Sequence, residues 1–220
     1  MKLLAALVLV LVPLQDKNEA ETLFRKMEEK ILKAKTLRAK LAGEMKEKKF
    51  TITGEFLADE GSKVRIEIEG KGEEEVRKAL VICDGKKLSF TAEAPVTFEV
   101  PETFGKLMRA SLARGGFLSA LEFADRESKA KTDPEEAYKV TGFKMEAREK
   151  VGDREAQAVS YTVTRKGRDA AATLWIDIST QLPLKRVLKV DTVTLTESYS
   201  DVRVDEKIDA AKFEIPKETK

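Results

Sequence analysis

Histidine is absent from the 220-residue sequence, and cysteine occurs once, as Cys83. Histidine is the commonest general base and the commonest side-chain metal ligand in proteins. Its absence excludes a Ser-His-Asp triad and a Cys-His pair built on Cys83. A single cysteine also cannot form an intramolecular disulfide. The fold therefore has to be held together by packing alone.

Motifs that bind phosphate or metal are missing as well. The "GKG" at residues 70–72 lacks the further glycines and the following helical pattern of a phosphate-binding loop. No carboxylate cluster has the spacing of a calcium loop. Carboxylate pairs such as Asp59 and Glu60 fall in predicted turns, where solvated side chains are commoner than acid–base pairs. We therefore expect no catalytic residue, no metal site and no cofactor, and we predict that the protein is not an enzyme.

The charges are nearly balanced and lie interspersed along the chain. Lys and Arg number 41 against 39 Asp and Glu, and charged residues make up 36% of the sequence. Proteins that bind nucleic acids need a basic excess gathered on one face. This pattern instead indicates a solvated outer surface, and we expect no nucleic-acid partner.

The first residues resemble a secretory signal. In "MKLLAALVLVLVPLQ", Lys2 precedes an apolar run over residues 3–12, which is too short to span a bilayer as a helix. We predict a signal peptide-like leader at residues 1–15, a single domain at 16–220, and a periplasmic or otherwise exported location. No pair of small residues follows Pro13 with cleavage-site spacing. The leader is therefore either cut at an atypical site or retained as a weak anchor.

Apolar spacing predicts a helix followed by strands. From Asn18, apolar residues recur at steps of three and four, which is typical of an amphipathic helix. From Leu37 onward they alternate with charged residues, which predicts strands with one apolar and one wet face. The pair Asp84-Gly85 between two apolar runs predicts a hairpin. The sheet is therefore expected to be antiparallel.

A helical insert interrupts the strands. Residues 101–126 return to helical spacing, with a break at Gly115-Gly116. Strand patterns resume near Tyr138, and Phe213 and Ile215 are expected to tuck a last edge under the sheet. These patterns together predict an α+β fold with one large antiparallel sheet, covered by the first helix and the insert.

The final third carries motifs of a known family. The strand "LWID" at 174–177, the corner "TQLPLK" at 180–185 and the closing "YSDVRVDEKIDAAKFEIP" at 199–216 together resemble the LolA-like family. The segment "AETLFRKMEEKILKAKTLRAKL" is similar to that family's opening helix and first strand. The resemblance implies a strongly curved antiparallel sheet, an unclosed half-barrel, covered by an N-terminal helix and a helical lid. An apolar cavity between sheet and lid would take acyl chains.

This resemblance implies an exported binder or carrier of lipid or lipoprotein acyl chains. Such a protein needs no catalytic group, because burial of each CH₂ contributes about 0.8 kcal/mol. A membrane-bound donor or acceptor protein is a further expected partner, and a monomer is expected. The alternative on the same fold is a non-enzymatic envelope regulatory or protein-docking domain.

The candidate cavity residues are the apolar side chains on the inward face of the predicted strands and of the lid. The same spacing is also typical of a filled core. Met27, Met108 and Met145 would supply adaptable lining. The predicted ligand-binding residues are Leu41, Ile52, Phe56, Ile66, Ile82, Phe90, Phe104, Leu107, Met108, Leu112, Phe117, Leu121 and Ile176.

Two further residues have ambiguous roles. In the family, an arginine of the early strands fastens the lid, and Arg38 is the nearest candidate by position. Arg38 alternates with Leu37 and Leu41, however, which predicts an outward-facing surface residue. Trp175 likewise alternates with Leu174 and its apolar neighbours, so cross-strand packing on the outside is the expected role.

Overall fold

The computed structural model describes residues 17–73, 75–91, 95–126 and 133–216, so the predicted leader lies outside the described residues. The helices are α1 (Lys17–Lys33), α2 (Phe104–Gly115), α3 (Phe117–Arg126) and α4 (Pro134–Ala137), with short 3-10 helices η1 (Lys46–Lys48) and η2 (Ala210–Phe213). The strands are β1 (Leu37–Met45), β2 (Phe50–Ala58), β3 (Lys63–Lys71), β4 (Val76–Asp84), β5 (Lys87–Thr91), β6 (Pro95–Glu99), β7 (Lys139–Val151), β8 (Arg154–Arg165), β9 (Arg168–Asp177), β10 (Pro183–Val190) and β11 (Val193–Val204).

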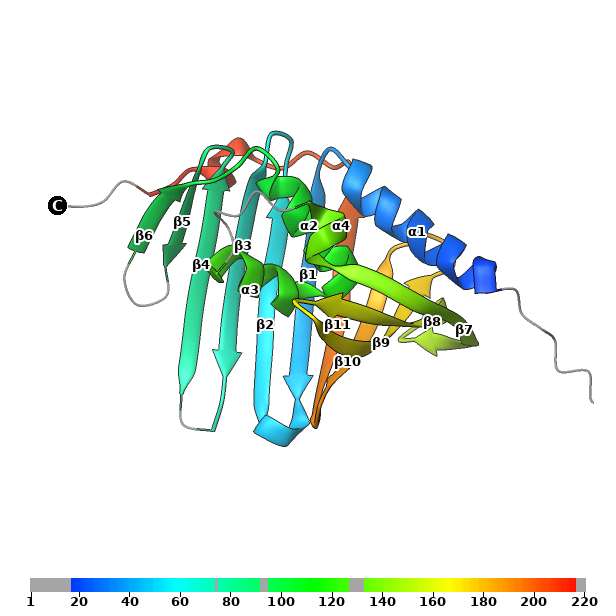
Figure 1. Ribbon diagram of the computed structural model, residues 1–220. Helices are drawn as coiled ribbons and strands as arrows, with labels where there is room; N and C mark the ends of the chain where they lie inside the picture. The colour runs from blue at the N-terminus through cyan, green and yellow to red at the C-terminus, as the bar shows by residue number, and fades with distance from the viewer. Residues whose placement is uncertain (1–16, 74, 92–94, 127–132, 217–220) are drawn as a thin grey trace, which may run out of the picture.

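The strands of the described residues form one antiparallel sheet that does not close into a barrel. Its eleven strands run in the order β6-β5-β4-β3-β2-β1-β11-β10-β9-β8-β7, which leaves β6 and β7 as its edges (Figure 1). The first strand, β1, pairs with the last, β11, near the centre of the sheet. The predicted α+β fold with an unclosed antiparallel sheet is thus confirmed.

Alternating burial gives the sheet two distinct faces. On β1, Leu37, Ala39 and Leu41 are buried, whereas Arg38 and Lys40 lie on the opposite side and are more exposed. We call the apolar face, which the helices cover, the inner face, and the opposite one the outer face. This alternation follows the two-residue period of a strand, so the sequence pattern itself sets which side is buried.

The helices cover the inner face (Figure 1). Helix α1 packs through Phe24, whose ring lies 5.0 Å from that of Phe143 on β7 and 4.9 Å from that of Tyr161 on β8. In α2, every residue except Lys106 is buried. Helix α2 is therefore almost fully enclosed by the rest of the protein, and only Lys106 is exposed to solvent.

The end of the described chain crosses the outer face. Residues 205–216, here called the C-terminal strap, are tied down where the Asp205 amide donates to the Thr36 carbonyl at 3.0 Å and Arg65 Nη1 donates to the Lys212 carbonyl at 3.1 Å. Phe213 is buried within η2, which lies against β3 and β4. The prediction that this segment adds a last sheet edge was wrong, because its backbone does not join the ladder.

Candidate functional site

Most of the predicted cavity residues meet in one apolar core between sheet and helices. Twelve of the thirteen either belong to that core or pack against it as partly buried side chains. The five on α2 and at the start of α3 are at most 3% exposed: Phe104, Leu107, Met108, Leu112 and Phe117. The interface beneath α2 is therefore closed in this state.

Ile82 is the exception among the predicted residues. It lies opposite Arg65 in the β3–β4 ladder, while its neighbour Cys83 lies opposite the core residue Val64. Ile82 therefore projects to the outer face, on the strand that η2 contacts, and it is buried there. Its assignment to the cavity was wrong because "ALVIC" is a continuous apolar run with no alternation to set the phase.

The inner face opens at one end into an apolar hollow of about 280 Å³, here called the mouth. Leu23 on α1 forms one wall, and Met145 and Ile176 from the sheet form another. Both Leu23 and Met145 pack against the core, to which Ile176 belongs. The mouth is thus a gap between α1 and the sheet that leads onto the buried apolar surface. Its lining residues are Leu23, Met145, Arg148, Gln157, Ile176, Asp177, Ile178 and Gln181.

A rigid corner after β9 shapes the rim of the mouth. The Asp177 carboxylate accepts from the Thr180 amide and from the Ser179 hydroxyl, both at 2.6 Å, and it pairs with Arg154 at 2.5 Å. Burial opposes ionisation, but these hydrogen bonds and the arginine charge outweigh it, so the pKa of Asp177 lies below its ordinary value. Lys30 on α1 donates to the Thr180 carbonyl at 2.7 Å, which ties the helix to the corner.

A buried arginine fastens the end of α2 to the sheet. Arg186 on β10 is fully buried, and its Nη1 and Nη2 donate to the carbonyls of Leu112 and Ala113 at 2.8 and 2.5 Å. The last carbonyls of a helix have no partners within the helix and carry its negative pole, so a cation stabilises them. Arg186 Nε has no hydrogen-bond partner among the described residues.

A buried glutamate fastens the start of α3 in the complementary way. The Glu197 carboxylate on β11 accepts from the Phe117 and Leu118 amides at 3.2 and 3.1 Å. These amides carry the positive pole of α3, where an anion is stabilising. Arg186 and Glu197 lie directly opposite each other in the β10–β11 ladder. Together they form a polar latch at the Gly115-Gly116 break.

Tyr199 completes the latch. Its hydroxyl donates to Glu197 Oε2 and accepts from Arg186 Nη1 at 3.1 Å. Burial raises the pKa of the Tyr199 phenol well above its ordinary value, and the Glu197 charge adds to the rise against the opposing effect of Arg186. The phenol therefore keeps its proton and remains a donor. Burial disfavours the charge on Arg186, but Tyr161, Tyr199 and Glu197 outweigh it and raise the pKa of Arg186.

Two arginines of α2 bind that helix to α1. Arg114 is fully buried and forms an ion pair with Glu28, and its Nη1 donates to the Tyr138 carbonyl at 2.8 Å. Arg109 Nη1 donates to the Ala34 carbonyl, and its Nη2 to the Lys35 carbonyl at 3.1 Å, just beyond the end of α1. Helices α1 and α2 are thus joined as one unit.

The sequence interpretation did not identify this buried polar network. A usable signal existed: Arg186 stands between Leu184 and Leu188 on the apolar phase of its strand, and Glu197 stands between Leu195 and Tyr199. A charged side chain at a buried position of a strand needs a hydrogen-bonding or oppositely charged partner, because burying an unpaired charge costs much free energy. Arg38, by contrast, lies on the outer face as predicted, paired with Glu55 at 2.8 Å.

Trp175 also lies on the outer face. It stands opposite Lys185 in the β9–β10 ladder, and Lys185 Nζ lies 4.5 Å from the ring centroid. The indole nitrogen donates to Glu149. Trp175 is therefore a cross-strand packing residue, as predicted from its position in the alternation.

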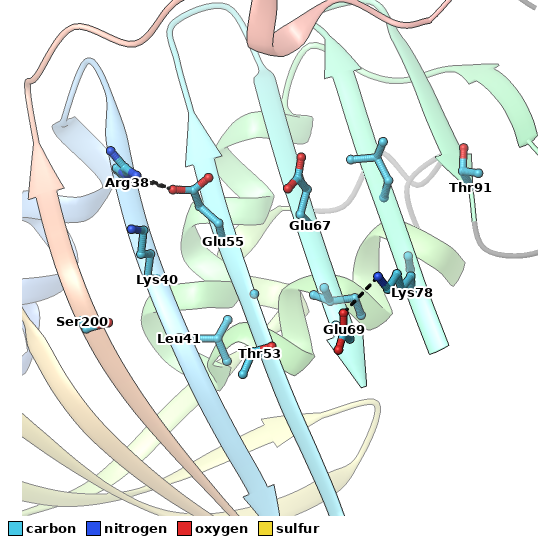
Figure 2. A pocket seen from close by; sticks show the side chains of 14 residues that line it. Arg38, Lys40, Leu41, Thr53, Glu55, Glu67, Glu69, Lys78, Thr91 and Ser200 are labelled. Atoms are coloured by element: carbon cyan, nitrogen blue, oxygen red, sulfur yellow. Dashed lines mark hydrogen bonds and ion pairs between the residues drawn. The ribbon is translucent and has the colours of Figure 1, made fainter. Parts of the chain in front are cut away.

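A larger hollow of about 910 Å³ lies on the outer face of β1–β5 (Figure 2). Each of its six charged side chains already has an oppositely charged partner: Arg38 with Glu55, Lys78 with Glu69 at 3.2 Å, Lys40 with Asp201, and Glu67 with Arg65. The three positive and three negative side chains of the lining cancel, so the hollow carries no net charge that would attract a charged ligand. The mouth on the inner face is therefore the better candidate site.

Among the described residues, no three His, Cys, Asp or Glu side chains lie together in a way that could hold a metal ion. None of the described helices is long and apolar enough to cross a membrane.

Comparisons with solved structures identify the fold. LprF from Mycobacterium bovis aligns with a TM-score of 0.52 and 12% identity over 88% of this chain and 96% of that one. The Mycobacterium tuberculosis lipoprotein LppX aligns with a TM-score of 0.50 and 9% identity over 88% and 98%. MucB aligns with a TM-score of 0.49 and 14% identity over 90% and 63%. Comparison with protein-family models and with curated protein sequences gives no match.

The fold is that of the LolA-like class, as the carboxyl-terminal motifs predicted. At these identities the likeness concerns the fold alone.

Proposed function

We propose that this protein is an exported, non-enzymatic binder of the acyl chains of lipids or lipoproteins. The observation that carries the proposal is the mouth, an apolar gap between α1 and the inner face of the sheet that leads onto a continuous apolar core. Its volume of about 280 Å³ is near the lower end of ligand pockets, which span roughly 300–1,000 Å³. A single acyl chain is the ligand that such a narrow apolar gap fits.

The latch supplies a route to a larger cavity. Arg186 and Glu197 are the polar groups of the sheet that fasten the α2–α3 break. Release of that break would free the start of α3 from Glu197 and uncover the apolar inner face beneath it. The shared fold with LppX, which is named a lipoprotein, supports an exported location and a lipid-related role.

The test measures binding of a neutral apolar probe, N-phenyl-1-naphthylamine, to the full chain, together with mass spectrometry of solvent extracts. Saturable binding, or co-purifying lipid with acyl chains, is the expected result. Ile178→Asp, on the rim, should weaken probe binding at least about fivefold, because a charge there disfavours apolar burial. Ile178 is 44% exposed, so the variant should fold.

Val190→Asp is the matched control, since Val190 is 40% exposed and lies away from the mouth. It should bind the probe like the wild type. Leu107 and Met108 are unsuitable for this test, because a carboxylate at these buried positions would prevent folding. A clean extract and no saturable binding would overturn the proposal and favour a protein-docking role for the fold.

A further inference from the structure

The mouth carries one cation that has no ionic partner. Arg148 on β7 lines it, and none of the described carboxylates lies within ion-pair distance of its guanidinium. Among the described residues, the side chain makes one polar contact, in which Nε donates to Gln157 Oε1 at 3.0 Å. The two terminal nitrogens have no hydrogen-bond or ion-pair partner among the described residues, so they remain available to a ligand.

Gln157 holds the guanidinium in place. It lies opposite Arg148 in the β7–β8 ladder and opposite the core residue Ile176 in the β8–β9 ladder, so all three side chains share the inner face. Its own amide nitrogen donates to the Glu146 carbonyl at 2.6 Å, which fixes the amide and leaves its oxygen to accept from Arg148. The positive charge is thus positioned at the rim by the sheet itself.

The other polar groups of the rim do not compete for this charge. Asp177 is the one acidic residue that lines the mouth, and Arg154, Ser179 and Thr180 already occupy its oxygens. Gln181 is neutral. Among the residues that line the mouth, Arg148 is therefore the one cation, and it lies beside walls formed by Leu23, Met145, Ile176 and Ile178.

From this arrangement we infer that the ligand is a single-chain amphiphile with an anionic headgroup, a carboxylate or a phosphate, which Arg148 binds at the mouth. The inference rests on the proposed function. A planar guanidinium with both terminal nitrogens available matches two oxygens of either anion. The chain enters between α1 and β9, and the headgroup stays at the wet rim.

The test compares three ligands of equal chain length: decanoate, decyl phosphate and 1-decanol, each displacing N-phenyl-1-naphthylamine from the full chain. The wild type should prefer at least one of the two anions over the alcohol by about tenfold. The anion that binds more tightly identifies the headgroup. Arg148→Gln should reduce that preference to about twofold or less and leave 1-decanol binding unchanged.

Lys150→Gln removes the same charge from the same strand but lies outside the mouth, where Lys150 pairs with Glu155 at 3.6 Å, and it should keep the preference. Arg148→Lys should retain part of the preference for the anion, because lysine keeps the positive charge but lacks the two parallel N–H donors of the guanidinium. Equal binding of all three ligands to the wild type, or an unchanged preference in Arg148→Gln, would overturn this inference while leaving the acyl-binding proposal intact. Failure of every ligand to bind would overturn both.

Discussion

Arg186 and Glu197 occupy facing positions on β10 and β11, and each stabilises the opposite pole of a different helix. The arginine meets the carbonyl end of α2 and the glutamate meets the amide end of α3. One cross-strand pair thus sets the position at which the two helices separate.

Loss of the arginine should destabilise the fold strongly. Arg186→Met leaves the buried Glu197 without its neighbouring cation and removes the arginine donors from the Leu112 and Ala113 carbonyls, of which Leu112 keeps only the Gly116 amide; this should lower the free energy of unfolding by about 3–5 kcal/mol. Urea denaturation monitored through Trp175 fluorescence would measure the change. Arg38→Met, which removes partly exposed ion pairs with Glu55 and Asp201 on the outer face, should cost about 1 kcal/mol. Equal effects of the two substitutions would contradict the importance of the latch.

Gly116 lies at the latch, and its backbone conformation and lack of a side chain are both required there. Its φ of 89° and ψ of −175° belong to a region that glycine alone adopts readily, and an added Cβ would contact the Glu197 carboxylate and lie 2.8 Å from Arg186 Nη1. Gly116→Ala should therefore lower the free energy of unfolding by about 3 kcal/mol or more. Gly152→Ala provides the comparison, because Gly152 also has a positive φ, of 65°, but nothing lies within 4 Å of its Cβ position. It should cost about 1–2 kcal/mol, measured in the same way.

Acid should weaken the corner beside the mouth. The pKa of Asp177 is lower in the folded protein than its ordinary value of 3.8, so its ionisation favours folding above that value, and this contribution is lost as the pH falls through the folded pKa. Asp177→Asn should cost about 1–3 kcal/mol at pH 7, and the difference from the wild type should shrink below about pH 4. Urea denaturation between pH 2.5 and 7 would show this convergence. Asp153→Asn, at an exposed turn, should behave like the wild type throughout.

The single thiol should be inert in the folded protein. Burial raises the pKa of Cys83 to about 11, so only about one thiol in a thousand is ionised at pH 8. Alkylation by iodoacetamide, followed by mass spectrometry, should be slow in buffer and complete in denaturant. Full labelling of the native protein within minutes would show that β4 opens locally.

The sequence predicted the sheet well because its strands have one wet face. Val64 and Ile66 alternate with Arg65 and Glu67, so the buried side could be read directly. Ile82 could not be placed in this way, because both faces of that end of β4 are covered, one by the helices and the other by the strap. A strand that is buried on both sides carries no alternation.

The candidate site was predictable in part. The core residues of α2 and α3 follow from helical spacing, and a charge on the buried phase of β10 marks Arg186 as unusual. Its partners could not be inferred, because Leu112 and Ala113 are more than seventy positions away in sequence. The mouth likewise depends on how α1 sits against β7 and β9, which no local pattern encodes.

The pairing of β1 with β11 has a consequence for biosynthesis. During translation β1 through β5 can form a meander, but β1 keeps one open edge until β11 leaves the ribosome, roughly ten seconds or more later at typical rates of synthesis. An open strand edge invites association with other chains. Arg38, Lys40 and Glu44 place charges along that edge. The polar face of β1 would therefore protect the growing chain from aggregation before it serves as part of the finished surface.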